Sequence, residues 1–372
     1  MVIMALDHTR DYFGNAAANP TDLATASAGL FLTRWITHFC APVFFLLSGT
    51  GAYLTGRRRS TGNLSRFLIT RGLWLVFLEL TVFRFIEAFN VDYHVTVLTV
   101  LWALGWSMVV LGALVWLPLG AIVTIGATMV VGHNALDGIA PAKLGALAPL
   151  WKVLHSPGPL IITPKSIVLL SYPLIPWIGV MALGYALGPV FTWPAERRRA
   201  FLLRWGIGLT IAFIGLRGLN VYGDPRPWSQ QPSDGFTFLS FLNVTKYPPS
   251  LLFLLMTLGP ALLFMRVFDG RTAGALRPAL TFGRVPMFYF LLHFSMIHLL
   301  AMLVCYVRFG SVHWVFESPT LDKFPFTQPP GWPVSLPWVY VAWATVVVLA
   351  YPCCRWYASY KARHSSAWLS YL

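Results

Sequence analysis

Long apolar stretches recur along almost the whole sequence, and short charged or Pro/Gly-rich connections separate them. A stretch of about 20 apolar residues is typical of a helix that crosses a bilayer, where every backbone group must be satisfied within the segment. The chain is 57% hydrophobic and only 11% charged, which excludes an ordinary water-soluble globular protein. We therefore predict an all-α, polytopic integral membrane helix bundle with about ten transmembrane helices, forming one membrane-embedded domain over residues 1–372. The predicted helices cover residues 1–13, 29–55, 66–90, 95–117, 119–134, 166–191, 200–221, 247–267, 285–307 and 336–355.

The first predicted helix is truncated at its start. Only the apolar residues 1–6 precede the first charged side chain. Six helical residues rise only about 9 Å, whereas the hydrocarbon core is about 30 Å thick. No basic leader and no small-residue cleavage site are visible, so we expect no cleavable signal. We expect the natural start of this helix to lie upstream.

Basic residues sort to one side of the membrane when the ten segments alternate in direction. That side holds more than half of the 27 Lys and Arg residues, and by the positive-inside rule it is cytoplasmic. Both chain ends are then cytoplasmic, as expected in a bacterial inner membrane, and the net charge of +14 reflects topology. We expect the lipid bilayer as a partner and no nucleic acid, because the chain has no soluble basic module. The clusters are Arg57, Arg58 and Arg59; Arg197, Arg198 and Arg199; Arg271, Arg277 and Arg284; and Lys361 and Arg363.

The sequence Asp7-His8-Thr9-Arg10-Asp11 places four ionisable side chains near the outer end of the first helix. Ionisable groups inside spanning helices are costly and mark functional sites. On a helix, Asp7 lies beside Arg10 and Asp11, and His8 lies beside Asp11. A carboxylate that holds one imidazole nitrogen leaves the other free to take a proton from a hydroxyl or amine, as in general-base catalysis. The alternative is a set of salt bridges at a helix end.

The second helix carries Arg34 and His38 one turn apart, followed by Pro42. Pro42 removes a backbone hydrogen bond and is predicted to kink the helix and expose a carbonyl to a cavity. Lys246 precedes the eighth helix, where a cation opposes the helix dipole. Its expected partner is an acidic side chain, a ligand or the lipid headgroups. For His38, a structural and a functional role both remain open.

The third helix carries Glu79, Arg84 and Glu87. Arg84 and Glu87 are three residues apart and are predicted to neutralise each other, which leaves Glu79 to find a partner on another helix. Such groups more often hold helices together than take part in catalysis.

The histidines and cysteines form no recognisable metal-binding pattern. His293 belongs to no recognisable ligand set, and the cysteines lack the spacing of a zinc site. We therefore expect no metal. The cysteines are Cys40, Cys305, Cys353 and Cys354.

Four motifs carry a family resemblance: Leu6-Asp7-His8-Thr9-Arg10-Asp11-Tyr12-Phe13, Trp35-Ile36-Thr37-His38-Phe39-Cys40-Ala41-Pro42, Lys246-Tyr247-Pro248-Pro249-Ser250, and Gly283-Arg284-Val285-Pro286 leading to His293. The chain resembles an uncharacterised bacterial membrane family. That family is similar to the catalytic domain of heparan-alpha-glucosaminide N-acetyltransferase, and more remotely to bacterial acyltransferases that decorate cell-surface sugars. The resemblance covers nearly the whole chain.

The resemblance implies transfer of an acyl group, expected to be acetyl, from cytosolic acetyl-CoA to a hydroxyl or amine of an outward-facing sugar or glycan. His8 would be the base, oriented by Asp7 or Asp11, and His38 would stabilise the oxyanion or share the proton transfer. Arg284, at the cytoplasmic mouth, would bind the nucleotide of the acyl-CoA. A homo-oligomer is compatible with the sequence. The expected substrate-binding residues are Arg10, Arg34, Lys246, Tyr247 and His293.

The position of the base differs from that in the glucosaminide enzyme. There the histidine assigned to catalysis lies on the outer loop after the first helix, and residues 14–29 of this chain contain no histidine. Catalysis by His8 is therefore a hypothesis from its chemistry. Two other functions remain open: a transporter or flippase for a lipid-linked sugar or small anion, without covalent chemistry, and a structural partner in the envelope.

Overall fold

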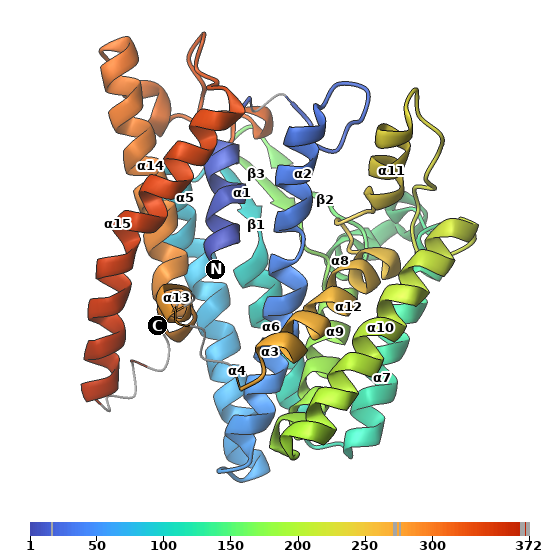
Figure 1. Cartoon of the computed structure of the whole chain (residues 1–372). Coiled ribbons are helices and arrows are strands. Elements are labelled where there is room, and N and C mark those ends of the chain that lie inside the picture. The colour runs from blue at the N-terminus through green and yellow to red at the C-terminus, as the bar shows by residue number, and fades with distance from the viewer. Residues whose placement is uncertain (16–17, 271–273, 275–276, 365–368, 370–372) are drawn as a thin grey trace.

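The structure is a bundle of long helices with a small sheet toward one end (Figure 1). It is a computed structural model that describes residues 1–15, 18–270, 274, 277–364 and 369. Each of the ten predicted segments contains a helix, so the polytopic all-α architecture is confirmed. The α-helices are α1 (Val2–Phe13), α2 (Ala28–Thr37), α3 (Cys40–Gly56), α4 (Thr61–Leu78), α5 (Arg84–Ala88), α6 (Val100–Leu114), α7 (Leu119–Gly132), α8 (Ala148–Leu154), α9 (Leu174–Leu187), α10 (Ala195–Leu219), α11 (Asp234–Leu242), α12 (Leu251–Phe268), α13 (Arg277–Arg284), α14 (Pro286–Phe309) and α15 (Leu336–Arg363).

Seven helical segments among the described residues are long and apolar enough to cross a membrane. This number is lower than the predicted ten because three of the predicted spans are shorter or more polar. Helix α1 has 12 residues and α6 has 15. Helix α4 includes Arg66 and Arg71 among its 18 residues. The seven segments are Ala28–Gly56, Leu119–Leu136, Leu174–Thr192, Ala195–Leu219, Leu251–Phe268, Pro286–Phe309 and Leu336–Arg363.

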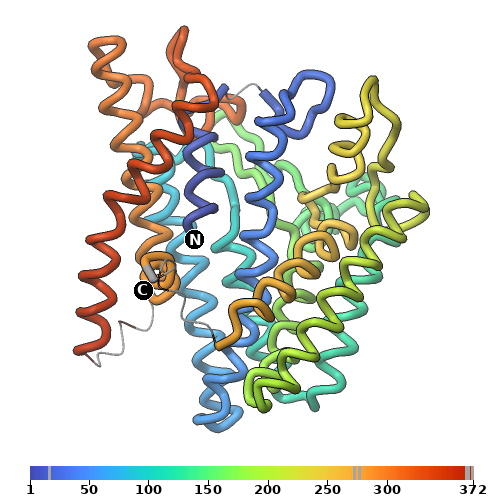
Figure 2. The backbone as a smooth tube through the Cα atoms, viewed as in Figure 1, coloured from blue at the N-terminus to red at the C-terminus, as the bar shows by residue number. Residues whose placement is uncertain are grey.

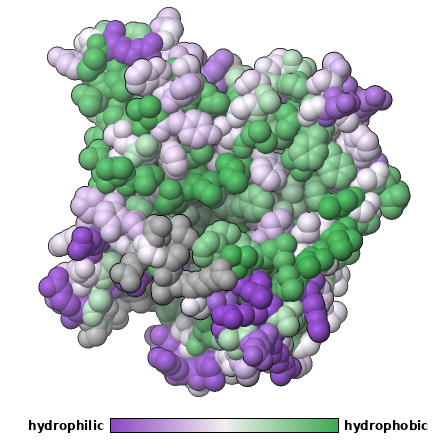
Figure 3. All heavy atoms as spheres, viewed as in Figure 1, coloured by the Kyte–Doolittle hydropathy of each residue, from purple (hydrophilic) through white to green (hydrophobic). Residues whose placement is uncertain are grey.

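The two ends of the bundle differ in charge. The arginines at residues 57–59, between α3 and α4, and those at residues 197–199, at the start of α10, lie at the same end, called here the basic end (Figure 1). Arg271, which the same prediction included, lies outside the described residues. The opposite end carries the loops that follow α1, α10 and α14, and is called the loop end. A broad apolar surface separates the two ends, as a membrane-embedded bundle requires (Figure 3).

The segment from α2 to α3 is interrupted at His38 and Phe39, which form a turn. Pro42, in the first turn of α3, has no N–H, and its ring would clash in a regular helix with the carbonyl of the residue four positions earlier, His38. The interruption thus lies where Pro42 is predicted to kink the helix, although the backbone of His38 and Phe39 keeps right-handed helical angles.

Three short strands form a sheet: β1 (Val95–Leu98), β2 (Gly158–Thr163) and β3 (Ser166–Leu170). The strand order is β1-β3-β2, with β1 parallel and β2 antiparallel to β3, and Val95 lies opposite Ile167. The prediction that residues 95–117 and 166–191 are helical is wrong at the start of each segment. The β-branched side chains there favour extended backbone, and their apolar character alone did not distinguish a strand from a helix.

Pairs of helices approach closely where glycines face each other. A Cβ atom on Gly184 of α9 would lie 2.1 Å from the Leu46 carbonyl oxygen of α3, and one on Gly49 would lie 2.0 Å from the Met181 carbonyl oxygen. Backbones that pack this closely gain van der Waals contact, which stabilises helix pairs inside a membrane.

Helices α14 and α15 run side by side along one flank of the bundle and contact α1 (Figure 2). Helix α1 also contacts α2. It begins near the middle of the bundle and ends toward the loop end (Figure 1). Its charged residues therefore lie among three helices, with the Asp11 side chain still 46% exposed.

Candidate active site

Helix α1 carries the ionisable side chains of Asp7, His8, Arg10 and Asp11 within little more than one turn. The Arg10 guanidinium lies 2.9 Å from the Asp7 carboxylate and 2.6 Å from that of Asp11. The Nδ1 atom of His8 lies 3.9 Å from Oδ2 of Asp11. The neighbours predicted from helical spacing are therefore confirmed.

Asp7 binds cations from three parts of the chain. Besides Arg10, its carboxylate forms an ion pair with Arg34 of α2 and lies 3.9 Å from Nζ of Lys246. The three cationic side chains are buried, with exposed fractions of 8% for Arg10, 14% for Arg34 and 9% for Lys246. Of the three kinds of partner expected for Lys246, the structure contains the acidic side chain. These four residues are called the Asp7 cluster.

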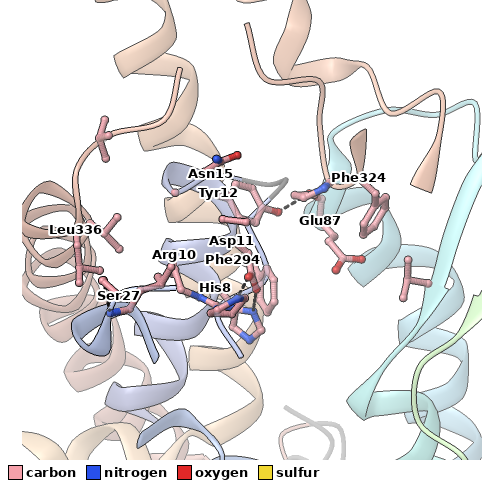
Figure 4. A pocket seen from close by; sticks show the side chains of 18 residues that line it. His8, Arg10, Asp11, Tyr12, Asn15, Ser27, Glu87, Phe294, Phe324 and Leu336 are labelled. Carbon is pink, nitrogen blue, oxygen red and sulfur yellow. Dashed lines mark hydrogen bonds and ion pairs between the residues drawn. The ribbon is translucent and has the colours of Figure 1, made fainter. Parts of the chain in front are cut away.

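His8 lies where α1 meets α14. Its ring centroid is 4.1 Å from that of Phe294 and 5.4 Å from that of His293. Figure 4 shows His8 beside Phe294 and Asp11. The distance of 3.9 Å to Asp11 exceeds a hydrogen bond, so the carboxylate would have to approach by about 1 Å to hold the ring. Orientation of the His8 ring by Asp11 therefore stays a prediction.

His293 supports the ring of His8 from α14. Its Nδ1 atom lies 2.8 Å from the Tyr289 carbonyl oxygen, while its Nε2 atom has no hydrogen-bond partner among the residues that the structure describes. Since a backbone carbonyl accepts a hydrogen bond, this contact favours the tautomer with the proton on Nδ1. The structure therefore brings His8 and His293, which lie far apart in sequence, into one site.

A cavity of about 450 Å³ opens on one side of His8, toward the loop end (Figure 4). It is called the larger cavity. The loop after α1 contributes Asn15 and Ser27, and the segment between α14 and α15 contributes Phe324. The mixture of amide, hydroxyl and ring groups suits a polar ligand with an apolar face.

A second cavity, of about 220 Å³, lies on the other side of the same residues. This smaller cavity is lined by Asp7, Arg34 and Lys246 of the Asp7 cluster, and by apolar side chains that include Met4 and Phe44. It also contains Tyr247, one of the predicted substrate-binding residues. Buried cations beside apolar walls suit a ligand with both an anionic or carbonyl group and an apolar chain.

Five residues line both cavities and form the wall between them. This wall contains two rings and three charged side chains, so a ligand bound in either cavity would contact the same residues. The five are His8, Arg10, Asp11, Glu87 and Phe294.

Glu87 is a site residue that the sequence assigned to a different role. The charges of Arg84 and Glu87 lie close enough to act on each other, as predicted, but the described residues contain no ion pair between them. Arg84 donates instead to Oδ1 of Asn90 at 2.9 Å and to the Val95 carbonyl at 2.5 Å. The Oε2 atom of Glu87 is buried and has no hydrogen-bond partner in the described part of the chain. The backbone explains why Arg84 binds elsewhere, because strand β1 places the Val95 carbonyl beside the Arg84 guanidinium. Glu79 behaves as predicted, since it accepts a hydrogen bond from the backbone N–H of Thr99, just before α6.

Three predicted site residues line neither cavity: His38, Arg284 and His293, the last of which lies behind the ring of His8. His38 ends α2, is 2% exposed, and its ring centroid lies 5.3 Å from that of Phe253. Arg284 ends α13 and is exposed. The proposed roles of His38 in catalysis and of Arg284 in coenzyme binding stay predictions.

The fold and this site define a polytopic α-helical membrane protein with a histidine and a cluster of charges buried between its helices. Over residues 1–223, the sequence matches the family described as heparan-alpha-glucosaminide N-acetyltransferase, catalytic. The chain belongs to this family, which is of the membrane acetyltransferase type, and the predicted resemblance is confirmed. No curated protein and no solved structure matches the chain.

The matched region holds only part of the site. It contains α1 and α2, and so includes Asp7, His8 and Arg34. Lys246 and His293 lie beyond it, although the structure places both against the residues of α1.

Proposed function

We propose that the protein is a membrane-bound acyltransferase that moves an acyl group, in the simplest case acetyl, from cytosolic acyl-CoA to a hydroxyl or amine of an extracytoplasmic sugar or glycan. The observation that carries this proposal is the meeting of two cavities at His8. A transfer between two substrates requires both reacting groups to reach one base, and His8 lies in the wall that both cavities share.

The smaller cavity fits the thioester end of the donor. Met4 and Phe44 offer apolar surface to the acyl group and the adjoining arm. Arg34 and Lys246 offer N–H donors to a carbonyl oxygen that becomes negative during transfer. The larger cavity, at the loop end, would take the acceptor sugar.

In the proposed reaction, an unprotonated nitrogen of His8 takes the proton of the acceptor hydroxyl or amine. The acceptor oxygen or nitrogen attacks the thioester carbonyl carbon, forming an ester or amide bond. The carbon–sulfur bond then breaks, and the thiolate leaves and takes up the proton that His8 accepted. Asp11 would orient the imidazole, and the Asp7 cluster would hold the carbonyl oxygen.

The test uses the purified full chain in lipid vesicles, with acetyl-labelled coenzyme A on one side and an acceptor bearing a terminal glucosamine on the other. The expected result is saturable binding of the coenzyme and appearance of label in the acceptor. Absence of coenzyme binding would overturn the proposal. Movement of unmodified acceptor across the membrane, with no acetyl transfer, would support the transporter or flippase that the sequence left open.

A further inference from the structure

A second cluster of ionisable side chains lies at the far end of α7, away from the residues that line the two cavities. His133 directly follows α7, Asp137 lies one turn later, and His155 follows α8. Nε2 of His155 is 3.1 Å from Oδ1 of Asp137, and the two imidazole rings have centroids 5.7 Å apart. One potential ligand atom from each of the three side chains lies within 4.8 Å of the other two.

The two histidines are buried with unused nitrogen atoms. His133 is 1% exposed, and neither of its ring nitrogens has a hydrogen bond of ordinary geometry to a described residue, although the Pro249 carbonyl lies nearby. His155 is 3% exposed, and its Nδ1 atom also lacks a partner in the described ranges. A buried polar atom without a partner costs free energy. The ring nitrogens of His133 therefore call for a ligand. In His155 the nitrogen beside Asp137 is Nε2, so Nε2 and not the unpartnered Nδ1 would bind an ion held with Asp137.

We propose that His133, Asp137 and His155 bind a divalent transition-metal ion, with Zn²⁺ as the best fit. Imidazole nitrogen and carboxylate oxygen are ligands that Zn²⁺ uses, and their bonds to it are about 2.1 Å long. Ligand atoms of a tetrahedral site are then about 3.4 Å apart. The Asp137–His155 distance of 3.1 Å is close to this spacing. The His133 nitrogen lies within 4.8 Å of the other two ligand atoms, so it would have to approach them by about 1 Å to complete a tetrahedral site.

Neighbouring contacts hold the three ligands in place. Asn134 donates a hydrogen bond of 2.9 Å to Oδ2 of Asp137, which leaves Oδ1 for the metal. The side-chain oxygen of Asn134 accepts a hydrogen bond from the N–H of Leu251, the first residue of α12. Carboxylate ligands are commonly fixed by such outer contacts. The metal would therefore tie the end of α7 to α8 next to the start of α12.

The sequence led us to expect no metal, whereas this proposal assigns a metal site. The three ligands are spread over more than 20 residues and contain no cysteine, so they match none of the spacing patterns that identify zinc sites in a sequence. Only the packing of α7 against the segment before β2 brings them together.

The experiment uses the full chain purified in detergent and freed of metal with a chelator. Isothermal titration with Zn²⁺ should show about one tight site per chain, and Co²⁺ should give the intense visible absorption of a low-coordinate complex. Zn²⁺ should also raise the apparent unfolding temperature of the wild type. Asp137→Asn and His155→Ala should each weaken Zn²⁺ binding by at least about tenfold. His313→Ala, which removes an exposed histidine from another loop, is the matched control and should bind as the wild type does.

Two results would overturn the proposal: no saturable Zn²⁺ binding by the wild type, or equal affinity in the wild type and Asp137→Asn. Because the Asp137 side chain is 24% exposed, this variant should fold even where changes at the buried histidines do not. Metal binding is measured without acyl transfer, so its failure would leave the proposed acyltransferase activity untouched.

Discussion

The Asp7 carboxylate pairs with the Arg34 guanidinium and so joins α1 to α2 inside the bundle. The same carboxylate lies 2.9 Å from Arg10 and 3.9 Å from Lys246. One buried acid thus faces three cations, and Asp11 adds a second negative charge beside Arg10, at 2.6 Å. Within the Asp7 cluster the cations outnumber the acid, although Asp11 and Glu87 line the same smaller cavity. The cationic side chains are the groups that an anionic or carbonyl-bearing ligand would contact.

Replacing Asp7 should destabilise the protein strongly. Asp7→Asn leaves buried cations without a counter-ion, which costs about 3 kcal/mol or more for a buried pair. The apparent unfolding temperature in detergent should fall, and acetyl transfer should be lost. Asp11→Asn is the matched control, since Asp11 is 46% exposed and its loss should matter far less for stability. Equal destabilisation by the two variants would contradict the central role of Asp7.

Removing the imidazole of His8 should abolish transfer without unfolding the chain. His8 is 24% exposed and lies in a cavity wall, so His8→Ala should keep the wild-type unfolding temperature within a few degrees. General-base catalysis contributes about 10²–10⁴-fold, and the initial rate of labelled acetyl transfer should fall by that factor while coenzyme binding persists. His313→Ala should transfer normally. Full activity of His8→Ala would exclude His8 as the base and leave the family membership intact.

Helical spacing and apolar runs predicted much of the fold and part of the site. The contacts of Asp7 with Arg10 and of His8 with Asp11 follow from residues three apart on one helix, and the structure contains both. The need of Lys246 for an anionic partner followed from its place before a helix. That the partner is Asp7 depends on how the segment before α12 packs against α1, which local pattern does not encode.

Other features required the three-dimensional structure. Val95 and Ile167 pair across strands that lie far apart in the chain, and their apolar character fitted a buried helix equally well. Glu87 has a plausible partner three residues away, yet the Val95 carbonyl takes the guanidinium of Arg84. Sequence spacing cannot show whether Arg84 binds Glu87 or the Val95 carbonyl. It therefore could not place Glu87 in the wall between the cavities.

Close packing of α3 on α9 should be sensitive to a single methyl group. In Gly184→Ala the new Cβ would lie 2.1 Å from the Leu46 carbonyl oxygen, so the helices must separate, at a cost of about 1–3 kcal/mol. The apparent unfolding temperature should fall by several degrees. Gly208→Ala in α10, where no atom lies within 4 Å of the new Cβ, should leave it unchanged or raise it, because Ala favours helix. Equal values for the two variants would show that the α3–α9 contact tolerates expansion.

The basic end contains a charge contact that should make stability depend on pH. Asp269 follows α12 and accepts hydrogen bonds of 3.0 Å from Arg198 and Arg199 at the start of α10. Burial raises the pKa of Asp269, but the hydrogen bonds and charges of these two arginines outweigh it, and the pKa lies below its usual value. A lowered pKa means that the folded state binds the proton less readily than the unfolded state. The contact therefore stabilises the fold above the unfolded pKa of about 4 and loses this effect as the pH falls through the lowered value.

Asp269→Asn should accordingly reduce the apparent unfolding temperature at neutral pH and lose its effect in acid. Ion pairs near the protein surface contribute about 1 kcal/mol or less, so the expected decrease at pH 7 is about 2 °C. The difference between wild type and variant should shrink as the pH is lowered below about 4, where the wild-type carboxylate also becomes neutral. Asp322→Asn, which removes an exposed carboxylate at the other end of the bundle, controls for the change in net charge. A difference that stays constant with pH would mean that Asp269 acts through the packing of its side chain, because packing does not require its charge.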